Sequence, residues 1–180
     1  RPQMATVRPG VMKLAEAQPG KQGEVEDFKV EFTPEDMNVT IKEVIKETKK
    51  AVDITDAKVL VSGGRGIGSA DYYKELQKVA DLLGGEISSS RANVDAGWIA
   101  KDRQVGQTGK TVRPDLYLAC GISGAIQHIA GMENSECVIS INKNDTAAIF
   151  DVSDLGIVGD VKVIIPKLID ALTKYKAAQN

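Results

Sequence analysis

The fold is decided by the stretch Leu116-Tyr-Leu-Ala-Cys-Gly-Ile-Ser-Gly-Ala-Ile-Gln-His128. The apolar run Leu116–Cys120 has the length of a buried strand, and a turn of small residues follows it. We expect a helix from Ser123 to about Met132. A strand that passes through such a turn into a helix directs free backbone N–H groups toward an anion. This stretch therefore predicts a ligand-binding crossover of an α/β protein.

The same alternation continues on both sides of this stretch. The expected strands are 58–61, 86–89, 116–120, 137–141 and 156–158, and the other expected helices run from about Ala70 to Leu83 and from Val161 to Leu172. Pro166 lies in the last pattern, so that helix either begins near the proline or is kinked there. Strands that alternate with helices form parallel βαβ units. We predict an α/β fold with a doubly wound, mostly parallel, Rossmann-like sheet.

Residues 1–56 differ in composition from the rest of the chain. Strand-like pieces at 4–7, 25–32 and 39–45 are separated by Pro-Gly turn signals and many charged residues. A short group of strands without partners is marginal alone. We therefore expect residues 1–56 to be the tail of a preceding domain and a linker, and residues 57–180 to be the ligand-binding domain. A flexible leader with transient strands is the alternative.

Composition excludes several classes of function. The 23 basic and 25 acidic residues give a net charge of −2, without the basic excess of a nucleic-acid or membrane-surface binder. One histidine and two separated cysteines, Cys120 and Cys137, cannot make a zinc site, and both thiols are expected in the core. No apolar run approaches the roughly 20 residues that span a bilayer. We expect no nucleic-acid partner and no membrane insertion, and a location in the cytoplasm or an organelle matrix, with the cytoplasm preferred.

Polar side chains follow every expected strand. They are Arg65, Ser90, Arg91, Ser123, Asn142 and Asp160. In parallel sheets ligands lie at the carboxyl ends of the strands, so these residues predict one common site. Simpler roles stay open, because Arg91 can pair with Asp95 or Asp102, Asn142 can be a turn residue and Asp160 can be a helix N-cap.

Two further features fit the same site. Gly106 and Gly109 flank Gln107 and Thr108 in the loop 105–110, which lets the backbone approach a ligand while two polar side chains face it. His128 is the only histidine and lies one turn into the helix that follows the small-residue turn. A lone histidine is often structural, but its place beside this turn favours a role in the site.

One motif points to a different class of protein. Val61-Ser-Gly-Gly-Arg-Gly-Ile-Gly-Ser69 resembles the glycine-rich turn of short-chain dehydrogenases, which use a nicotinamide cofactor. That family also needs a Tyr-x-x-x-Lys pair, and no tyrosine of this chain has a lysine four residues later. An NAD(P)-dependent oxidoreductase of the short-chain type is therefore the alternative reading, and a tight turn that contacts a phosphate or ribose through Arg65 is preferred.

Several motifs together resemble the FAD-binding domain of the electron transfer flavoprotein alpha subunit. The resemblance covers about Lys58 to Leu172 and rests on Val59-Leu-Val-Ser-Gly-Gly-Arg-Gly66, Ser90-Arg-Ala-Asn-Val-Asp-Ala-Gly97, Gln104-Val-Gly-Gln-Thr-Gly-Lys110, Gly121-Ile-Ser-Gly-Ala-Ile-Gln-His128, Ile141-Asn-Lys143 and the stretch 151–160. It implies that residues 1–56 are the end of that subunit's N-terminal domain.

The resemblance also implies which residues contact FAD. They are Arg65, Ser90, Arg91, Gln104, Val105, Gly106, Gln107, Thr108, Ser123, Gly124, Ala125, Ile126, Gln127, His128, Asn142 and Asp160. By this likeness Thr108 hydrogen-bonds the flavin ring near N5, Arg91 lies against the ring and His128 approaches its N1/O2 edge. The turn 123–127 serves the pyrophosphate, and Asn142 and Asp160 hold the adenosine portion.

A function follows from the resemblance as an expectation. Proteins of this family are redox carriers rather than enzymes that transform a substrate. They form a heterodimer with the electron transfer flavoprotein beta subunit, accept electrons from flavin dehydrogenases such as acyl-CoA dehydrogenases, and pass them on through an anionic semiquinone. Cations and hydrogen-bond donors around the flavin ring suit that role, because they stabilise added negative charge.

Overall fold

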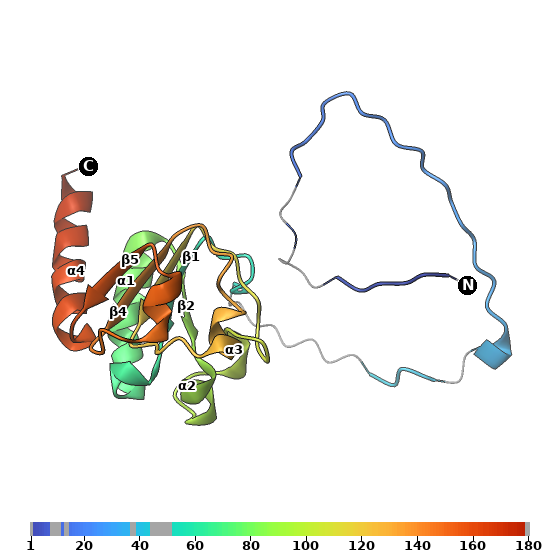
Figure 1. The fold of residues 1–180 in the computed structure, drawn as a ribbon. Helices are drawn as coiled ribbons and strands as arrows, with labels where there is room; N and C mark the ends of the chain where they lie inside the picture. The colour runs from blue at the N-terminus through green and yellow to red at the C-terminus, as the bar shows by residue number, and fades with distance from the viewer. Residues whose placement is uncertain (1, 8–11, 13–14, 37–38, 44–51, 179–180) are drawn as a thin grey trace. The chain divides into compact units, whose positions relative to one another are not determined.

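A computed structural model of the chain describes residues 2–7, 12, 15–36, 39–43 and 52–178 (Figure 1). The chain divides into two compact units, Arg1–Met12 with Val52–Asn180, and Lys13–Ala51. In the described ranges, every strand and every α-helix falls between Val59 and Ala177. This part of the chain holds the candidate site.

Five parallel strands form one sheet, which confirms the predicted α/β fold. The strands are β1 (Val59–Gly63), β2 (Glu86–Ser89), β3 (Leu116–Cys120), β4 (Val138–Asn142) and β5 (Leu155–Val158), in the spatial order β2-β1-β3-β4-β5. From β1 the chain adds β2 on one side and then crosses over to add β3 on the other. Ligands of wound parallel sheets lie at this change of direction, outside the carboxyl ends of the strands.

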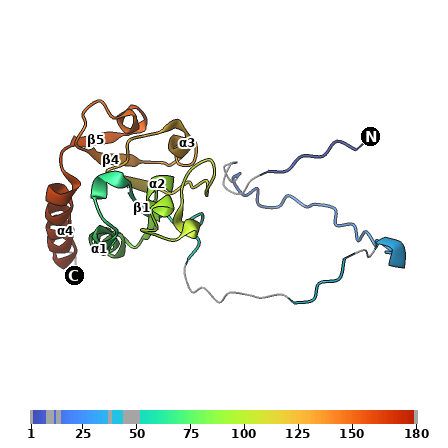
Figure 2. The same cartoon turned by 90° about the horizontal axis from the view of Figure 1, so that it is seen from below.

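One face of the sheet is covered by α1 (Tyr73–Leu83) and α4 (Val161–Ala177), which lie side by side (Figures 1 and 2). Leu76 and Val79 of α1 and Ile165 of α4 are fully buried in the same core cluster as the strand residues of this face. The apolar spacing of three and four residues thus predicted α1 correctly. Its end is also as predicted, since Gly84 caps it with φ +67°, a value that glycine adopts without strain.

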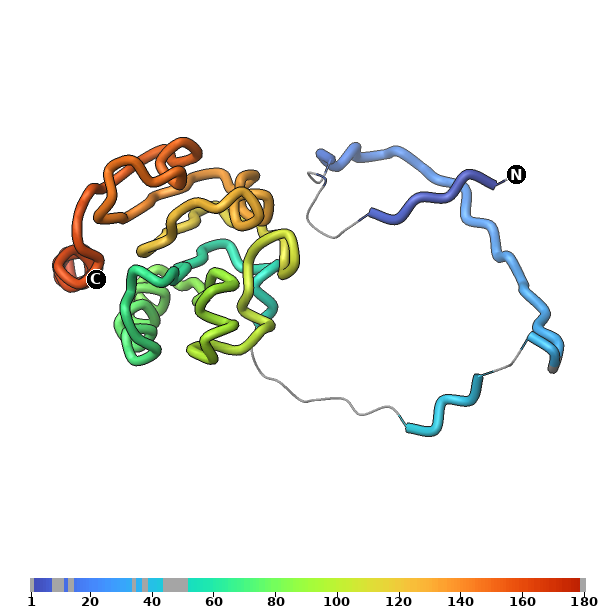
Figure 3. Tube along the Cα trace, turned by 60° about the horizontal axis from the view of Figure 1, so that its bottom comes forward, coloured from blue at the N-terminus to red at the C-terminus, as the bar shows by residue number. Residues whose placement is uncertain are grey.

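Shorter segments cover the other face. They are α3 (Ile126–Ile129), the 3-10 helix Ala148–Val152 and residues 52–58 before β1, whose Ile54 and Ala57 belong to the core of this face; Figure 3 draws their backbone trace. Tyr117, Met132 and Ile149 are fully buried in the core of this face. Both helical segments are short, and the turn that leads from β3 into α3 lines the cavity at the strand ends.

The C-terminal helix passes through its proline. Helix α4 begins at Val161, with Asp160 as N-cap, and the Asp160 carboxylate accepts a hydrogen bond from the Lys162 N–H at 2.8 Å. Pro166 therefore lies inside the helix, which excludes the alternative in which the helix begins at the proline. Proline removes its own N–H from the helix and its ring crowds the carbonyl four residues earlier, and the packing of Val161 and Ile165 against the sheet offsets this cost.

The expected strands of the leader are not present in its described residues. The pieces 4–7 and 25–32 and the described part of 39–45 contain no strand, while residues 44 and 45 lie outside the described ranges. Phe28 and Phe32 are largely exposed. Strands need partner edges, and the described leader offers none. The assignment of residues 1–56 to a preceding domain and linker stays a prediction.

No helix in the described part of the chain is long and apolar enough to cross a membrane. The same residues contain no group of three or more histidine, cysteine or acidic side chains that could hold a metal ion.

Candidate functional site

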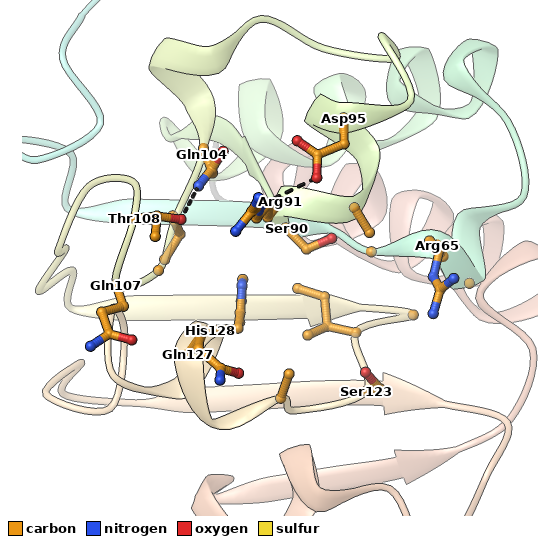
Figure 4. Close-up of a pocket in the computed structure, with 18 of the residues that line it drawn as sticks. Arg65, Ser90, Arg91, Asp95, Gln104, Gln107, Thr108, Ser123, Gln127 and His128 are labelled. Atoms are coloured by element: carbon orange, nitrogen blue, oxygen red, sulfur yellow. Dashed lines mark hydrogen bonds and ion pairs between the residues drawn. The ribbon is translucent and has the colours of Figure 1, made fainter.

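A cavity of about 610 Å³ opens at the carboxyl ends of the strands, and Figure 4 shows its lining. Its volume lies within the range of small-molecule and cofactor sites. The lining residues are Gly64, Arg65, Gly66, Ser90, Arg91, Ala92, Asp95, Gln104, Val105, Gly106, Gln107, Thr108, Gly121, Ile122, Ser123, Ala125, Gln127, His128 and Asn142. They come from the segments after β1, β2 and β3 and from the end of β4, as the strand-end argument predicts.

The turns after β1 and β3 form one wall of the cavity. The Gly64 N–H donates to the Cys120 carbonyl at 2.9 Å, and the Gly66 N–H donates to the Gly121 carbonyl at 3.0 Å. A Cβ added at Gly66 would lie 2.6 Å from the Gly121 Cα, which no side chain tolerates. The glycines thus allow the two turns to touch, and Arg65 is held at the rim between them.

The loop after β2 forms the opposite end. Gln104 is buried, and its side-chain amide donates to the Thr108 hydroxyl oxygen at 3.0 Å. The Gln107 N–H donates to the Gln127 carbonyl at 2.7 Å, which ties the loop to the first turn of α3. Because the Thr108 oxygen already accepts a hydrogen bond, its own hydrogen can be donated to a ligand.

Arg91 combines the two roles that the sequence left open. It begins the short helix α2 (Arg91–Asp95), lines the cavity, and its Nε lies 3.2 Å from a carboxylate oxygen of Asp95. Both side chains are about two-thirds exposed, so the ion pair is weak and leaves the guanidinium open to a ligand. No helix was expected between the strands 86–89 and 116–120, so α2 is an element that the sequence analysis missed. The spacing of four residues between Arg91 and Asp95 would have indicated the helical pair.

His128 projects into the cavity from α3, toward Arg91 in Figure 4. The imidazole is buried, and its Nε2 lies 2.9 Å from the Tyr117 hydroxyl. Burial lowers the pKa of His128 to about 4, against the opposing effect of the Val105 backbone. The ring is therefore neutral near pH 7, and the described part of the cavity carries positive charge only from Arg65 and Arg91.

Helix α3 is shorter than the expected span of Ser123 to about Met132. It ends at Ile129, and the Gly131 carbonyl accepts a hydrogen bond from the Val112 N–H at 2.8 Å. The backbone of Gly106 packs directly against Gly131, where a Cβ would lie 2.5 Å from the Gly106 Cα. A segment distant in sequence thus packs against the chain just beyond the end of α3 and satisfies the Gly131 carbonyl.

Thirteen of the sixteen predicted site residues line the cavity, and three do not. The three are Gly124, Ile126 and Asp160. Gly124 packs on the 3-10 helix Ala148–Val152, the Ile126 side chain is 75% exposed, and Asp160 caps α4 and pairs with Lys143 at 2.9 Å. Asn142 does line the cavity, and its side-chain amide also donates to the Ile122 carbonyl at 2.7 Å. A contact of any of these residues with FAD stays a prediction.

An ion pair anchors the loop that carries Thr108. The Lys110 Nζ lies 2.8 Å from the Asp53 carboxylate, which also accepts a hydrogen bond from the Thr55 N–H at 3.0 Å. The Lys110 hydrogen bond, followed by that of the Thr55 backbone, lowers the pKa of Asp53 to about 2. Residues just before the first strand therefore hold one end of the cavity in place.

We expect Asp53→Asn to reduce the free energy of unfolding at pH 7 by less than about 1 kcal/mol, because the Asp53 side chain is half exposed to solvent. The contribution of the carboxylate is present above its unfolded pKa, near 4, and is lost as the pH falls toward 2. Urea denaturation of the parent chain and of the variant, at pH 7 and again near pH 2, measures this contribution. Asp71→Asn is the control, because Asp71 forms a largely exposed pair with Lys74. An equal loss in the two variants would contradict the anchoring role.

A parallel α/β sheet whose strand ends surround an elongated cavity with two guanidinium groups, glycine turns and hydroxyl donors defines a nucleotide-cofactor-binding domain. Residues 53–133 match the sequence family described as "Electron transfer flavoprotein FAD-binding domain". The chain is thus similar to electron transfer flavoprotein alpha subunits, and the part of it that matches the family model is the domain that binds FAD in that family.

Several curated relatives are similar over nearly the whole chain. The electron transfer flavoprotein subunit alpha of Thermoanaerobacterium thermosaccharolyticum is 53% identical over 98% of the chain and 53% of the relative. That of Clostridium acetobutylicum is 52% identical over 100% of the chain and 53% of the relative. The acryloyl-CoA reductase electron transfer subunit beta of Anaerotignum propionicum is 49% identical over 99% of the chain and 50% of the relative.

The chain spans about half the length of these curated relatives. Their names describe electron carriers and not enzymes that transform a substrate, and this agrees with the expected class. The alternative of a nicotinamide-dependent oxidoreductase finds no support in these similarities.

Proposed function

We propose that residues 57–178 bind FAD in this cavity and carry electrons from flavin dehydrogenases, such as acyl-CoA dehydrogenases, to a downstream acceptor. The proposal includes a heterodimer with an electron transfer flavoprotein beta subunit and a location in the cytoplasm. The relatives that are named electron transfer flavoprotein alpha subunits support the carrier role and the partner.

The order of side chains along the cavity carries the proposal. Gln107 and Thr108 lie at one end, Arg91 and His128 near the middle, and Ser123 and Arg65 at the other end (Figure 4). The resemblance assigns Thr108, Arg91 and His128 to the flavin ring and the turn at Ser123 to the pyrophosphate. An extended ligand with a polar ring at one end and two phosphates toward the other fits this order.

The chemistry of the lining also suits the cofactor. The cavity has two guanidinium groups and one carboxylate, so its charge is positive and complements a pyrophosphate. Its glycine turns allow backbone to approach the ligand, as phosphate sites require. The flavin, when bound, supplies the one-electron chemistry, and the proposal includes an anionic semiquinone that Arg91 and the Thr108 hydroxyl stabilise. The protein itself binds and orients the flavin and tunes its potential.

Titration of the chain with FAD tests the proposal. We expect flavin fluorescence to be quenched at a 1:1 ratio and the protein to stay yellow after gel filtration. Arg65→Gln should weaken binding about 10-fold or more, because a charge-assisted hydrogen bond contributes roughly 1.5–3 kcal/mol. The control Lys78→Gln removes a cation from the surface of α1, where Lys78 pairs with Glu75, and should leave the affinity unchanged. Hydride transfer from a nicotinamide without flavin binding would refute the proposal.

We expect Arg91→Ala to lower the one-electron potential of the bound flavin by about 60 mV, the lower part of the range for one charge-assisted hydrogen bond. The effect is at the lower end because Asp95 already offsets part of the Arg91 charge. Asp95→Asn should therefore raise the same potential. Spectroelectrochemical titration measures both shifts, and shifts of the same sign in the two variants would contradict the role of this ion pair.

A further inference from the structure

The helix α2, which presents Arg91 to the cavity, is too short to be stable by itself. It has five residues, and isolated helices of fewer than about 12 residues are marginal in water. Within residues 90–95, all of them described, the Ser90 side chain makes no capping hydrogen bond and Asn93 is the one buried residue. The order of α2 therefore depends largely on the contacts of Asn93.

Asn93 reaches the carboxyl end of β1. Its side-chain amide donates to the Gly63 carbonyl at 3.2 Å and to the Tyr73 hydroxyl oxygen at 2.9 Å. The Gly63 carbonyl also accepts a hydrogen bond from the Ser90 N–H at 3.1 Å, and the Tyr73 hydroxyl lies 2.5 Å from the Ser89 hydroxyl oxygen. These contacts connect α2 to β1, to β2 and to α1.

Only one orientation of the Asn93 amide fits these partners. A carbonyl oxygen can only accept hydrogen bonds, so the group that lies against the Gly63 carbonyl must be the NH₂ group. The Asn93 Oδ1 is buried and has no hydrogen-bond partner in the described part of the chain. Asn93 thus acts in this network as a donor, and a side chain that donates no hydrogen bond should not replace it.

The backbone of β1 is shaped for this contact. A Cβ at Gly63 would lie 2.9 Å from the Tyr73 hydroxyl oxygen, so a glycine is what allows the tyrosine to lie against the strand. Gly63 also ends β1 directly before the turn that carries Arg65. The segments that carry the two guanidinium groups of the cavity therefore meet at the Gly63 carbonyl.

We propose that Asn93 is a positioning residue, which fixes α2 on the end of β1 before any ligand binds and thereby holds the Arg91 guanidinium at the cavity. The anchoring of α2 is a property of the chain alone. The part that concerns the ligand rests on the proposed FAD site.

The contacts of Arg91 itself cannot position the helix. Its side chain is about two-thirds exposed, and its pair with Asp95 lies within α2 (Figure 4). The place of the guanidinium is therefore set by the place of the helix. A charge that is already held in position stabilises negative charge on a ligand without a further ordering cost on binding.

Amide hydrogen exchange of the ligand-free chain at pH 7 tests the anchor. The N–H groups of residues 96–98 donate to carbonyls of residues 92–94, so they report on α2. We expect them to be protected in the parent chain. Asn93→Ala removes both side-chain hydrogen bonds and should accelerate their exchange about 10-fold or more, with α1 unchanged. Tyr73→Phe removes only one acceptor and should cause a smaller acceleration.

The one-electron potential of bound FAD tests the effect on Arg91. Arg91→Ala is expected to lower this potential in the parent chain. When Asn93 is already alanine, the shift that Arg91→Ala causes should fall to about half or less, because the guanidinium is no longer held beside the ligand. A merely structural role of Asn93 would leave that shift unchanged.

Ser140→Ala is the matched control. Ser140 is fully buried in β4, which β3 separates from β1, and its hydroxyl lies 2.6 Å from the Ser153 hydroxyl oxygen. Its loss removes a buried hydrogen bond of the same sheet without touching α2. The exchange of the α2 amides and the shift caused by Arg91→Ala should both stay within about twofold of their parent values.

The outcomes separate the two proposals. Unprotected α2 amides in the parent chain overturn the anchor, even if Asn93→Ala does not fold. Unchanged exchange in a folded Asn93→Ala variant overturns it as well, and would assign the order of α2 to the packing of Trp98 just beyond it. Protection that Asn93→Ala removes, in a chain that does not bind FAD, would support the anchor and refute the proposed function.

Discussion

Gly124→Ala is expected to reduce the free energy of unfolding by about 3–5 kcal/mol, the largest effect of any single substitution considered for this chain. Gly124 has φ +85°, and a Cβ there would lie 2.6 Å from the carbonyl carbon of Ala148 and closer still to the Ile149 nitrogen. Those are backbone atoms of the 3-10 helix Ala148–Val152, which cannot move aside as a flexible side chain would. The cost thus combines left-handed strain with overpacking.

The same substitution should also disturb the cavity. The Ile149 N–H donates to the Ser123 carbonyl at 3.1 Å, so the turn that carries Ser123, Ala125 and His128 rests on this 3-10 helix. Displacing the turn moves lining residues although Gly124 is not one of them. Weaker FAD binding at a temperature where the variant is still folded is therefore a second expected result.

Gly97→Ala provides the control for backbone strain. Gly97 has φ +72°, but a Cβ there meets nothing within 4 Å. Gly97→Ala should therefore reduce the free energy of unfolding only by the strain of left-handed backbone, about 1–2 kcal/mol. Urea denaturation of the two variants separates strain from close packing, and equal losses would show that the contact with Ala148 and Ile149 yields easily.

The stability of the chain should fall by up to about 3 kcal/mol as the pH decreases from 6.5 to 4, because His128 is buried as a neutral ring. The unfolded chain binds a proton at this ring below about pH 6.5, whereas the folded chain does so only near pH 4. The unfolded state thus holds more protons across this window, so stability increases with pH within it.

One side chain, His128, accounts for the change in stability in the upper part of this pH window. The chain has a single histidine, and unperturbed carboxylates titrate below about pH 5. Denaturation midpoints between pH 5 and 7 therefore report on His128, and His128→Gln should flatten the dependence there. A slope that persists in His128→Gln would place the responsible proton elsewhere in the chain.

Local sequence pattern was sufficient for the strands and for the edge of the sheet that carries the site. Short runs of three to five residues, each followed by a polar or small residue, indicated β1 to β5, and parallel pairing then brought the residues after β1, β2 and β3 together. Helix α1 was equally clear, since its apolar spacing and its terminal glycine are both local signals.

The predictions from local sequence were wrong where contacts between residues far apart in the chain outweighed a local preference. Helix α3 ends at Ile129, and Gly131 just beyond it packs on the Gly106 backbone; the leader forms no strand in its described residues. The short helix α2 lacks the periodicity of a longer one, so it was not expected, and the sequence left open whether Arg91 pairs with Asp95 or with Asp102.

By itself, the sequence determined the class of fold, the order of its elements and the set of polar residues at the strand ends, because these depend on hydrophobic period and turn chemistry along a few neighbouring residues. Only the tertiary structure decided that Asp160 caps α4 outside the cavity, that Gln104 directs the Thr108 hydroxyl, and that Tyr117 lies against His128. Those relations depend on distances across the sheet between residues on different elements, and hydrophobic period carries no information about such distances.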